Sequence, residues 1–140
     1  MKKLTKLIFL FTLFLTLGSA SIHAQAASKT YYLLGNTIKS QRDTGGEAIY
    51  KGSKIVFSGK WRKSTSTKKL YDAEFKTFKK SIKLSKNCKF CSVSARGVST
   101  TTLKKIVKSN KMKKGDSIFL TTQLQIKVKK GKIVEIAAIH

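Results

Sequence analysis

The last third of the chain constrains the fold most strongly, because hydrophobic and polar residues alternate there with the period of a β-strand. In residues 117–129 (SIFLTTQLQIKVK) every second side chain belongs to one face. This face consists of Ile118, Leu120, Thr122, Leu124, Ile126 and Val128. Residues 132–139 (KIVEIAAI) follow directly after Lys130-Gly131, a pair that suits a tight turn. The pattern predicts two long strands joined as a β-hairpin.

Three further segments in the first half are rich in β-branched and aromatic residues, and glycine or asparagine separates them, as is typical of short strands. They are residues 29–34 (KTYYLL), 47–50 (EAIY) and 54–61 (KIVFSGKW). In the last of them Ile55 and Phe57 alternate with their neighbours, which indicates one half-buried face. The polar residues 62–69 (RKSTSTKK) are then expected to form an exposed loop.

Residues 70–84 fit two structures, because their aromatic residues recur at helical spacing while Tyr71, Ala73 and Phe75 also alternate. We favour two strands with a turn near Thr77. The reason is that residues 81–90 continue the alternation and contain no residue that would end a helix.

A short helix is expected to begin at Thr101 or Thr102 and to end at Ser109, because a threonine can cap its start. Leu103, Ile106 and Val107 form one apolar stripe on it, and Asn110 is suited to terminate it. The later part of the chain then reads strand, strand, strand, helix, strand, strand. This order predicts a mainly β fold, a small OB-like five-stranded barrel with one short helix, and an extra N-terminal hairpin before it.

Residues 103–139 resemble the closing half of small exported bacterial OB-like β-barrel domains of unknown function. The likeness lies in residues 114–118 (KGDSI) and 130–133 (KGKI), since in those domains a helix leads into a G-D-x-V strand and a G-x-I strand completes the barrel. Residues 84–90 (LSKNCKF) resemble their central strand. The resemblance implies a fold and carries no activity with it.

The N-terminal residues have the pattern of a secretory signal peptide. Three lysines precede the apolar residues 7–17 (LIFLFTLFLTL), and Ala24-Gln25-Ala26 matches the small-residue rule of signal peptidase. We expect residues 1–26 to be removed and residues 27–140 to form a single small β domain outside the cytoplasm, 114 residues long (140 minus 26). The alternative, a retained membrane anchor, needs about 20 apolar residues, and polar side chains follow too soon.

The chain is strongly basic, with a formal net charge of +24 that becomes +21 (24 minus 3) without the signal peptide's lysines. Only Arg42, Arg62 and Arg96 among the basic residues are not lysine. Lysine supplies hydrated point charge, whereas arginine suits bidentate recognition of one anion. The bias favours attraction to an anionic polymer, such as a cell-wall polyanion, nucleic acid or acidic glycan. The alternative is a solvated surface that keeps an exported protein soluble.

Basic residues and aromatics are interleaved over residues 61–83, where an OB-like barrel would present the face that binds oligonucleotides or oligosaccharides. In this interpretation Trp61 and Tyr71 are stacking platforms. The alternative is that the aromatics belong to the core and the lysines lie on the solvent-exposed face of an antiparallel sheet. The candidate binding residues are Trp61, Arg62, Lys63, Lys68, Lys69, Tyr71, Lys76, Lys79, Lys80 and Lys83.

Cys88 and Cys91 form the only C-x-x-C motif. Residues three apart in an extended strand are separated by roughly 10 Å and point to opposite faces, so we expect two free thiols. A local disulfide between Cys88 and Cys91 remains an alternative if a turn interrupts the strand. A redox site would need the first cysteine at a helix start, which the local pattern does not favour.

Other chemistry has few candidate residues. His140 is the only histidine after the signal peptide, which disfavours a zinc site and a nucleophile-histidine dyad. Asp72 and Glu74 could share a strand face, but this spacing also describes ordinary solvent-facing positions. The sequence therefore predicts a non-enzymatic domain with no catalytic residues, no metal and no cofactor.

Overall fold

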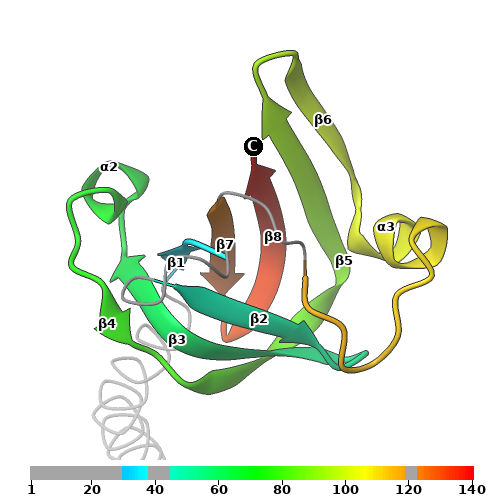
Figure 1. Cartoon of the computed structure of the whole chain (residues 1–140), viewed down its shortest axis with the longest axis horizontal. Coiled ribbons are helices and arrows are strands. Elements are labelled where there is room, and N and C mark those ends of the chain that lie inside the picture. The colour runs from blue at the N-terminus through cyan, green and yellow to red at the C-terminus, as the bar shows by residue number, and fades with distance from the viewer. Residues whose placement is uncertain (1–29, 38–44, 119–122) are drawn as a thin grey trace, which may run out of the picture.

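The computed structural model describes residues 30–37, 45–118 and 123–140, and they form a mainly β fold (Figure 1). The predicted signal peptide (residues 1–26), together with Leu120 and Thr122 of the predicted face, lies outside the described residues. The described elements, in chain order, are β1 (Tyr31–Gly35), β2 (Gly46–Tyr50), β3 (Lys54–Ser64), α2 (Thr67–Leu70), β4 (Lys76–Thr77), β5 (Lys80–Ser94), β6 (Gly97–Thr102), α3 (Leu103–Ser109), β7 (Gln123–Lys129) and β8 (Lys132–Ile139).

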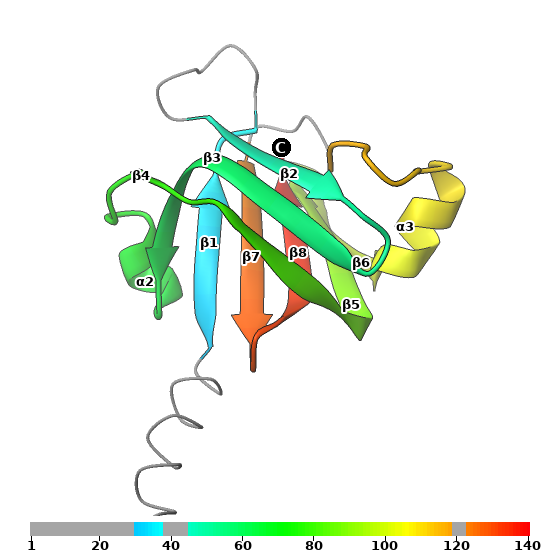
Figure 2. The same cartoon turned by 90° about the horizontal axis from the view of Figure 1, so that it is seen from below.

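Five of these strands pair in a closed circuit. β1 lies between β3 and β7, β8 lies between β7 and β5, and β5 pairs back with β3. All these pairings are antiparallel except that of β5 with β8, which is parallel. β2 and β4 add to β3 outside the circuit, and β6 adds to β5. In Figure 2, β3 and β5 cross obliquely over the neighbouring strands β1, β7 and β8.

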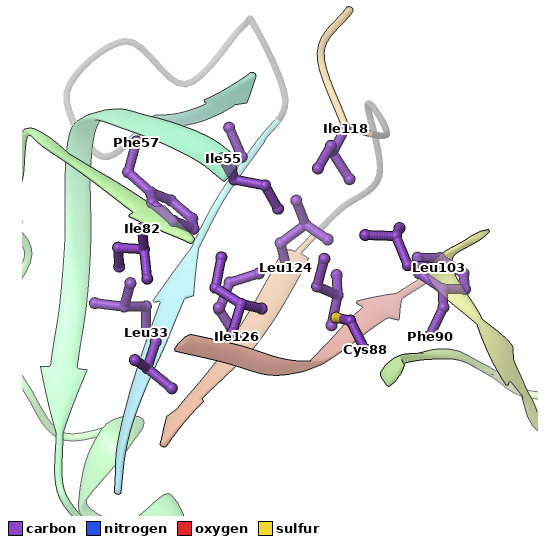
Figure 3. Close-up of a cluster of buried hydrophobic side chains, with 14 of the residues drawn as sticks. Leu33, Ile55, Phe57, Ile82, Cys88, Phe90, Leu103, Ile118, Leu124 and Ile126 are labelled. Atoms are coloured by element: carbon purple, nitrogen blue, oxygen red, sulfur yellow. The ribbon is translucent and has the colours of Figure 1, made fainter. Parts of the chain in front are cut away.

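The hydrophobic core lies inside this circuit (Figure 3). β3, β5, β7 and β8 contribute buried side chains whose neighbours along the strand are mostly more exposed, whereas β1 is buried over three consecutive residues, 33–35. Phe57 and Trp61 meet edge to face with ring centroids 5.2 Å apart, an arrangement that aromatic pairs prefer. The buried set includes Leu33, Ile55, Phe57, Ile82, Phe90, Leu124, Ile126, Val128, Ile133 and Ile136.

The predicted C-terminal hairpin is confirmed over its described part. Leu124, Ile126 and Val128 are fully buried on one face of β7, as the alternation predicted. Lys130 and Gly131 join β7 to β8 with φ of 54° and 74°, the positive values that a two-residue turn of type I′ requires. Ile118 is also buried, but it precedes β7 and lies outside any strand.

The predicted helix is also confirmed. α3 has Thr102 as its N-cap, whose side chain accepts a hydrogen bond from the Lys105 backbone N–H at 3.3 Å. Asn110 is the C-cap. Leu103 is buried, and Ile106 and Val107 pack against the core cluster, so the apolar stripe faces the sheet as expected.

Three predictions about the first half are wrong in detail. β3 extends to Ser64 and is followed by the one-turn helix α2, so residues 62–69 are not simply a loop, and the described residues contain two helices rather than one. Residues 71–75 form a turn and an irregular segment, β4 has only two residues, and β5 begins at Lys80. Of the two structures considered for residues 70–84, the strand interpretation is closer.

The expected extra N-terminal hairpin is not a separate unit. β1 belongs to the closed circuit, because it pairs with β3 on one side and with β7 on the other, and its Leu33 and Leu34 are buried. β2 lies outside the circuit, paired with the first half of β3.

Candidate functional site

Most of the predicted binding residues lie in residues 62–83, which run from the end of β3 through α2 and β4 to the start of β5 (Figure 1). We name this segment the excursion. Asp72 and Glu74 are the only acidic residues in this excursion, and both are exposed. Tyr71 is 49% exposed, so its ring is free to contact a ligand. The exposed lysines of the excursion are Lys63, Lys68, Lys69, Lys76, Lys79, Lys80 and Lys83.

Trp61 does not fit its predicted role as a stacking platform. Its side chain is 1% exposed, and its indole N–H donates to the Ser58 backbone oxygen at 2.8 Å. Two glycines make this position possible: a Cβ on Gly35 would lie 2.5 Å from the indole ring, and one on Gly46 would lie 2.6 Å from it. Trp61 is therefore a core residue, in keeping with the alternative interpretation of the aromatics.

Arg62 is engaged inside the excursion. One of its terminal nitrogens donates to the Tyr71 backbone oxygen, and its guanidinium lies 4.3 Å from the centroid of the Phe75 ring. Its Nε is buried and has no hydrogen-bond partner. These contacts hold the segment after α2 against β3, so Arg62 acts first as an internal brace.

A hollow of about 550 Å³ lies between this excursion and the strands β1 and β3. The Lys63 ammonium lies 4.6 Å from the centroid of the Tyr31 ring at its wall, close enough for a cation-π contact. Burial raises the pKa of the Tyr31 hydroxyl above its ordinary value, so this phenol stays neutral. Glu74 and Lys76 add one charge of each sign. Of the ten predicted residues, only Trp61, Lys63 and Lys76 line this hollow.

Lys80 and Lys83 lie on a different part of the surface. Both are on β5, where Lys80 pairs with Phe57 and Lys83 pairs with Lys54 of β3. The predicted residues therefore divide between a hollow, a braced loop and a strand, and they do not converge on a single pocket.

The structure also places near Lys83 three lysines that sequence reasoning did not select. Lys54 and Lys132 pair with it, and Lys129 pairs with Lys132. Each of them directly precedes or follows a buried residue in its own strand, a local signal that could have marked it as facing outward. Lys129 and Lys132 meet across the predicted hairpin. The pairing of Lys83 with Lys54 and with Lys132 joins distant segments, which no local signal contains.

Both cysteines are free in the structure. Cys88 is buried in the core, and burial, with a smaller contribution from the negative charge of Glu135, raises the pKa of its thiol to about 12. Cys91 is partly exposed, and its Sγ lies 3.7 Å from the Thr100 hydroxyl. A thiol with such a raised pKa is a poor nucleophile at neutral pH, which argues against redox chemistry at Cys88.

Within residues 30–37, 45–118 and 123–140, no group of three or more His, Cys, Asp or Glu side chains is placed to hold a metal ion. In the same part of the chain, no helix has the length and apolarity needed to cross a membrane. Comparisons with protein-family models, with curated proteins and with solved structures find no match for this chain.

Proposed function

We propose that this chain is an exported, non-enzymatic domain that binds anionic polymers outside the cytoplasm, at or near the bacterial cell surface. The observation that carries the proposal is the exposed excursion from β3 to β5, which presents seven lysines, namely Lys63, Lys68, Lys69, Lys76, Lys79, Lys80 and Lys83. Charge of this density attracts a polyanion by releasing its condensed counterions. The signal-peptide pattern of residues 1–26 supports export.

The strand circuit supports an OB-like barrel as part of this proposal. Its members β1, β3, β5, β7 and β8 follow the order of three strands, a helix and two strands, with α3 between the third and the fourth. OB-like barrels bind extended polymers on an open face rather than in a deep pocket. The resemblance of residues 103–139 to exported OB-like domains agrees with this interpretation.

A second candidate, a structural or interaction domain of the cell envelope without a polyanion ligand, is favoured by one observation. Arg62 and Lys63 both make internal contacts, to the Tyr71 carbonyl and to the Tyr31 ring. If the other lysines only solubilise the surface, the chain would bind polyanions no better than any protein of similar charge.

Affinity for a labelled oligothymidylate, measured by fluorescence anisotropy over a range of salt concentrations, separates the two candidates. We expect log affinity to fall linearly with log salt, with a slope of about 0.7 per phosphate contact. Changing Lys68, Lys69, Lys76 and Lys79 together to Gln should make the slope shallower. The matched control replaces four exposed lysines in and after α3, namely Lys104, Lys105, Lys108 and Lys111.

An unrelated protein of similar net charge is the second control. If the parent chain binds the oligothymidylate no more tightly than that protein, the chain is not a polyanion-binding domain and the structural candidate stands. If the two quadruple variants lose affinity equally, the excursion contributes only its net charge.

A further inference from the structure

Four neighbouring strands place a lysine at the same level of the circuit. Lys54 of β3 pairs with Lys83 of β5, and Lys83 pairs in turn with Lys132 of β8. Lys132 also pairs with Lys129 of β7, next to the turn at Lys130 and Gly131. We name Lys54, Lys83, Lys132 and Lys129 the lysine row. Segments that are far apart in the sequence thus form one line of positive charge across four strands.

The lysine row faces away from the core. Each member adjoins a buried residue in its own strand, and these neighbours pair in the same order: Ile55 opposite Ile82 and Val128 opposite Ile133. Successive side chains of a strand point to opposite faces, so the four lysines point outward. All four are exposed. None of them lines either the hollow beside Tyr31 or a smaller one of about 300 Å³ beside α3.

The arrangement sets like charges against one another. Side chains directly opposite on paired strands have Cβ atoms about 4.5 to 5.5 Å apart, and like charges at such positions are destabilising. The charges lie at the ends of flexible, exposed stems that can turn apart, so the repulsion is modest and is weakened by salt. Every pairing within the lysine row joins two lysines, and no carboxylate stands between them. A bound anionic chain would supply the missing negative charge.

We propose that the lysine row binds the phosphodiester backbone of a linear polyanion. This inference rests on the proposed function and assigns it a ligand class and a site. Three strand spacings of about 4.8 Å give the row a span of roughly 14 Å. A phosphodiester chain carries one negative charge per repeat unit, so a backbone laid along the row brings a few phosphates within reach of its four lysines. Lysine is suited to this contact because it meets phosphate as a point charge on a flexible stem.

The row contacts the backbone of the polymer and not its bases. Its members are all lysines, and base recognition on such open surfaces depends on aromatic platforms. The exposed ring of Tyr71 lies after α2, on the excursion and outside the row. A polymer that carries phosphodiesters without bases should therefore bind as well as a nucleic acid of equal length.

The row also changes how the proposed function has to be tested. Lys83 belongs both to the basic excursion and to the row, and its neighbour Lys132 lies on the C-terminal hairpin. Variants on β7 and β8 are therefore unsuitable as remote controls for the excursion.

The test compares a row variant, with Lys54, Lys83, Lys129 and Lys132 all changed to Gln, with the α3 variant at Lys104, Lys105, Lys108 and Lys111. Both remove four positive charges from exposed positions. The probes are labelled oligothymidylate and poly(glycerol phosphate) of equal chain length, with polygalacturonate as a carboxylate polymer. We expect the row variant to lower the slope of log affinity against log salt by up to about 3, since at most four contacts at about 0.7 each are lost. The α3 variant should lower it by less than about 1.

Each of the other outcomes contradicts a different part of the proposal. If the parent chain binds neither phosphodiester polymer better than an unrelated protein of similar charge, the proposed function itself fails. If the parent chain binds but the row and α3 variants lose affinity equally, the row proposal is overturned while polyanion binding stands. Markedly tighter binding of oligothymidylate than of poly(glycerol phosphate) would overturn backbone recognition. Tighter binding of polygalacturonate than of both would overturn the phosphodiester class.

Discussion

Next to the lysine row, on the same outer surface, lies a second row in which a carboxylate stands between two lysines. Further along β5, β8 and β7, Glu135 pairs with Lys89 on one side and with Lys127 on the other. We name Lys89, Glu135 and Lys127 the balanced row. Both rows cross β5, β8 and β7, and the lysine row continues onto β3. Both point away from the same core, since Phe90, Ile126 and Ile136 beside the balanced row are buried. They differ in whether a carboxylate stands at the β8 position.

The comparison shows that the placement of charge distinguishes the two regions, although both are rich in lysine. In the balanced row each lysine has an acidic cross-strand partner, an arrangement that stabilises a sheet. In the lysine row each pairing is repulsive. The lysine row is therefore the region to which the proposed polyanion binding assigns its contacts.

The largest expected effect comes from changing Glu135 to Lys, which turns the balanced row into a second lysine row. Two attractive pairings become repulsive, so the free energy of unfolding should fall by about 1 to 2 kcal/mol at low salt. Urea unfolding measures this loss, because urea does not add ions, and the loss should shrink in concentrated salt. The same variant should bind oligothymidylate more tightly than the parent.

Glu47→Lys is the matched control for that change. Glu47 is exposed on β2 and pairs with Ser58, so it changes the net charge equally without facing a lysine. An equal loss of stability in both variants would mean that total charge, and not the pairing at Glu135, governs the effect.

A smaller effect is expected from Lys83→Gln in the lysine row. It removes two repulsive pairings, with Lys54 and with Lys132, so the free energy of unfolding should rise by about 0.5 kcal/mol at low salt. Lys89→Gln, on the same strand but opposite Glu135, should give no gain or a small loss. Urea unfolding at two salt concentrations distinguishes these outcomes. If both variants gain equally, the two rows do not differ energetically.

The smallest expected effect connects the balanced row to the core, through the influence of Glu135 on Cys88. Burial is the main cause of the raised thiol pKa, so Glu135→Gln should lower it only partly from about 12. Alkylation followed by mass spectrometry over a range of pH measures this change. In the folded parent Cys91 should be labelled at neutral pH while Cys88 is labelled only slowly, and both should react after unfolding. Equal labelling of the two cysteines in the folded chain would contradict the burial of Cys88. A disulfide between Cys88 and Cys91 would contradict the finding that both thiols are free.

The sign of the pH effect on stability follows from the same shift. The folded state disfavours the thiolate of Cys88, so its thiol contributes a stability that is fully present below the ordinary cysteine pKa. That contribution is lost as the pH rises through about 12.

Local patterns predicted those parts of the fold that depend on residues close together in the chain. The alternation in residues 123–129 and 132–139, the turn at Lys130-Gly131 and the cap at Thr102 are all short-range features, and the structure contains each of them. Residues 70–84 were ambiguous because their aromatics satisfied two periodicities at once. The brace from Arg62 to the segment after α2 and the pairing of β4 with β3 select the observed path, and both are contacts outside the segment's own periodicity.

The sequence by itself determined a mainly β chain with a strong positive charge, one capped helix and a closing hairpin, because these follow from composition and from periodicities of two and 3.6 residues. Only the tertiary structure decided that Trp61 is buried against Gly35 and Gly46 and that β1 joins the circuit of strands. It alone decided that Lys54 and Lys83 lie in one row with Lys132 and Lys129, the pair beside the predicted turn. The physical reason is that strand pairing brings together residues that are tens of positions apart, and its register is set by the burial of all strands at once.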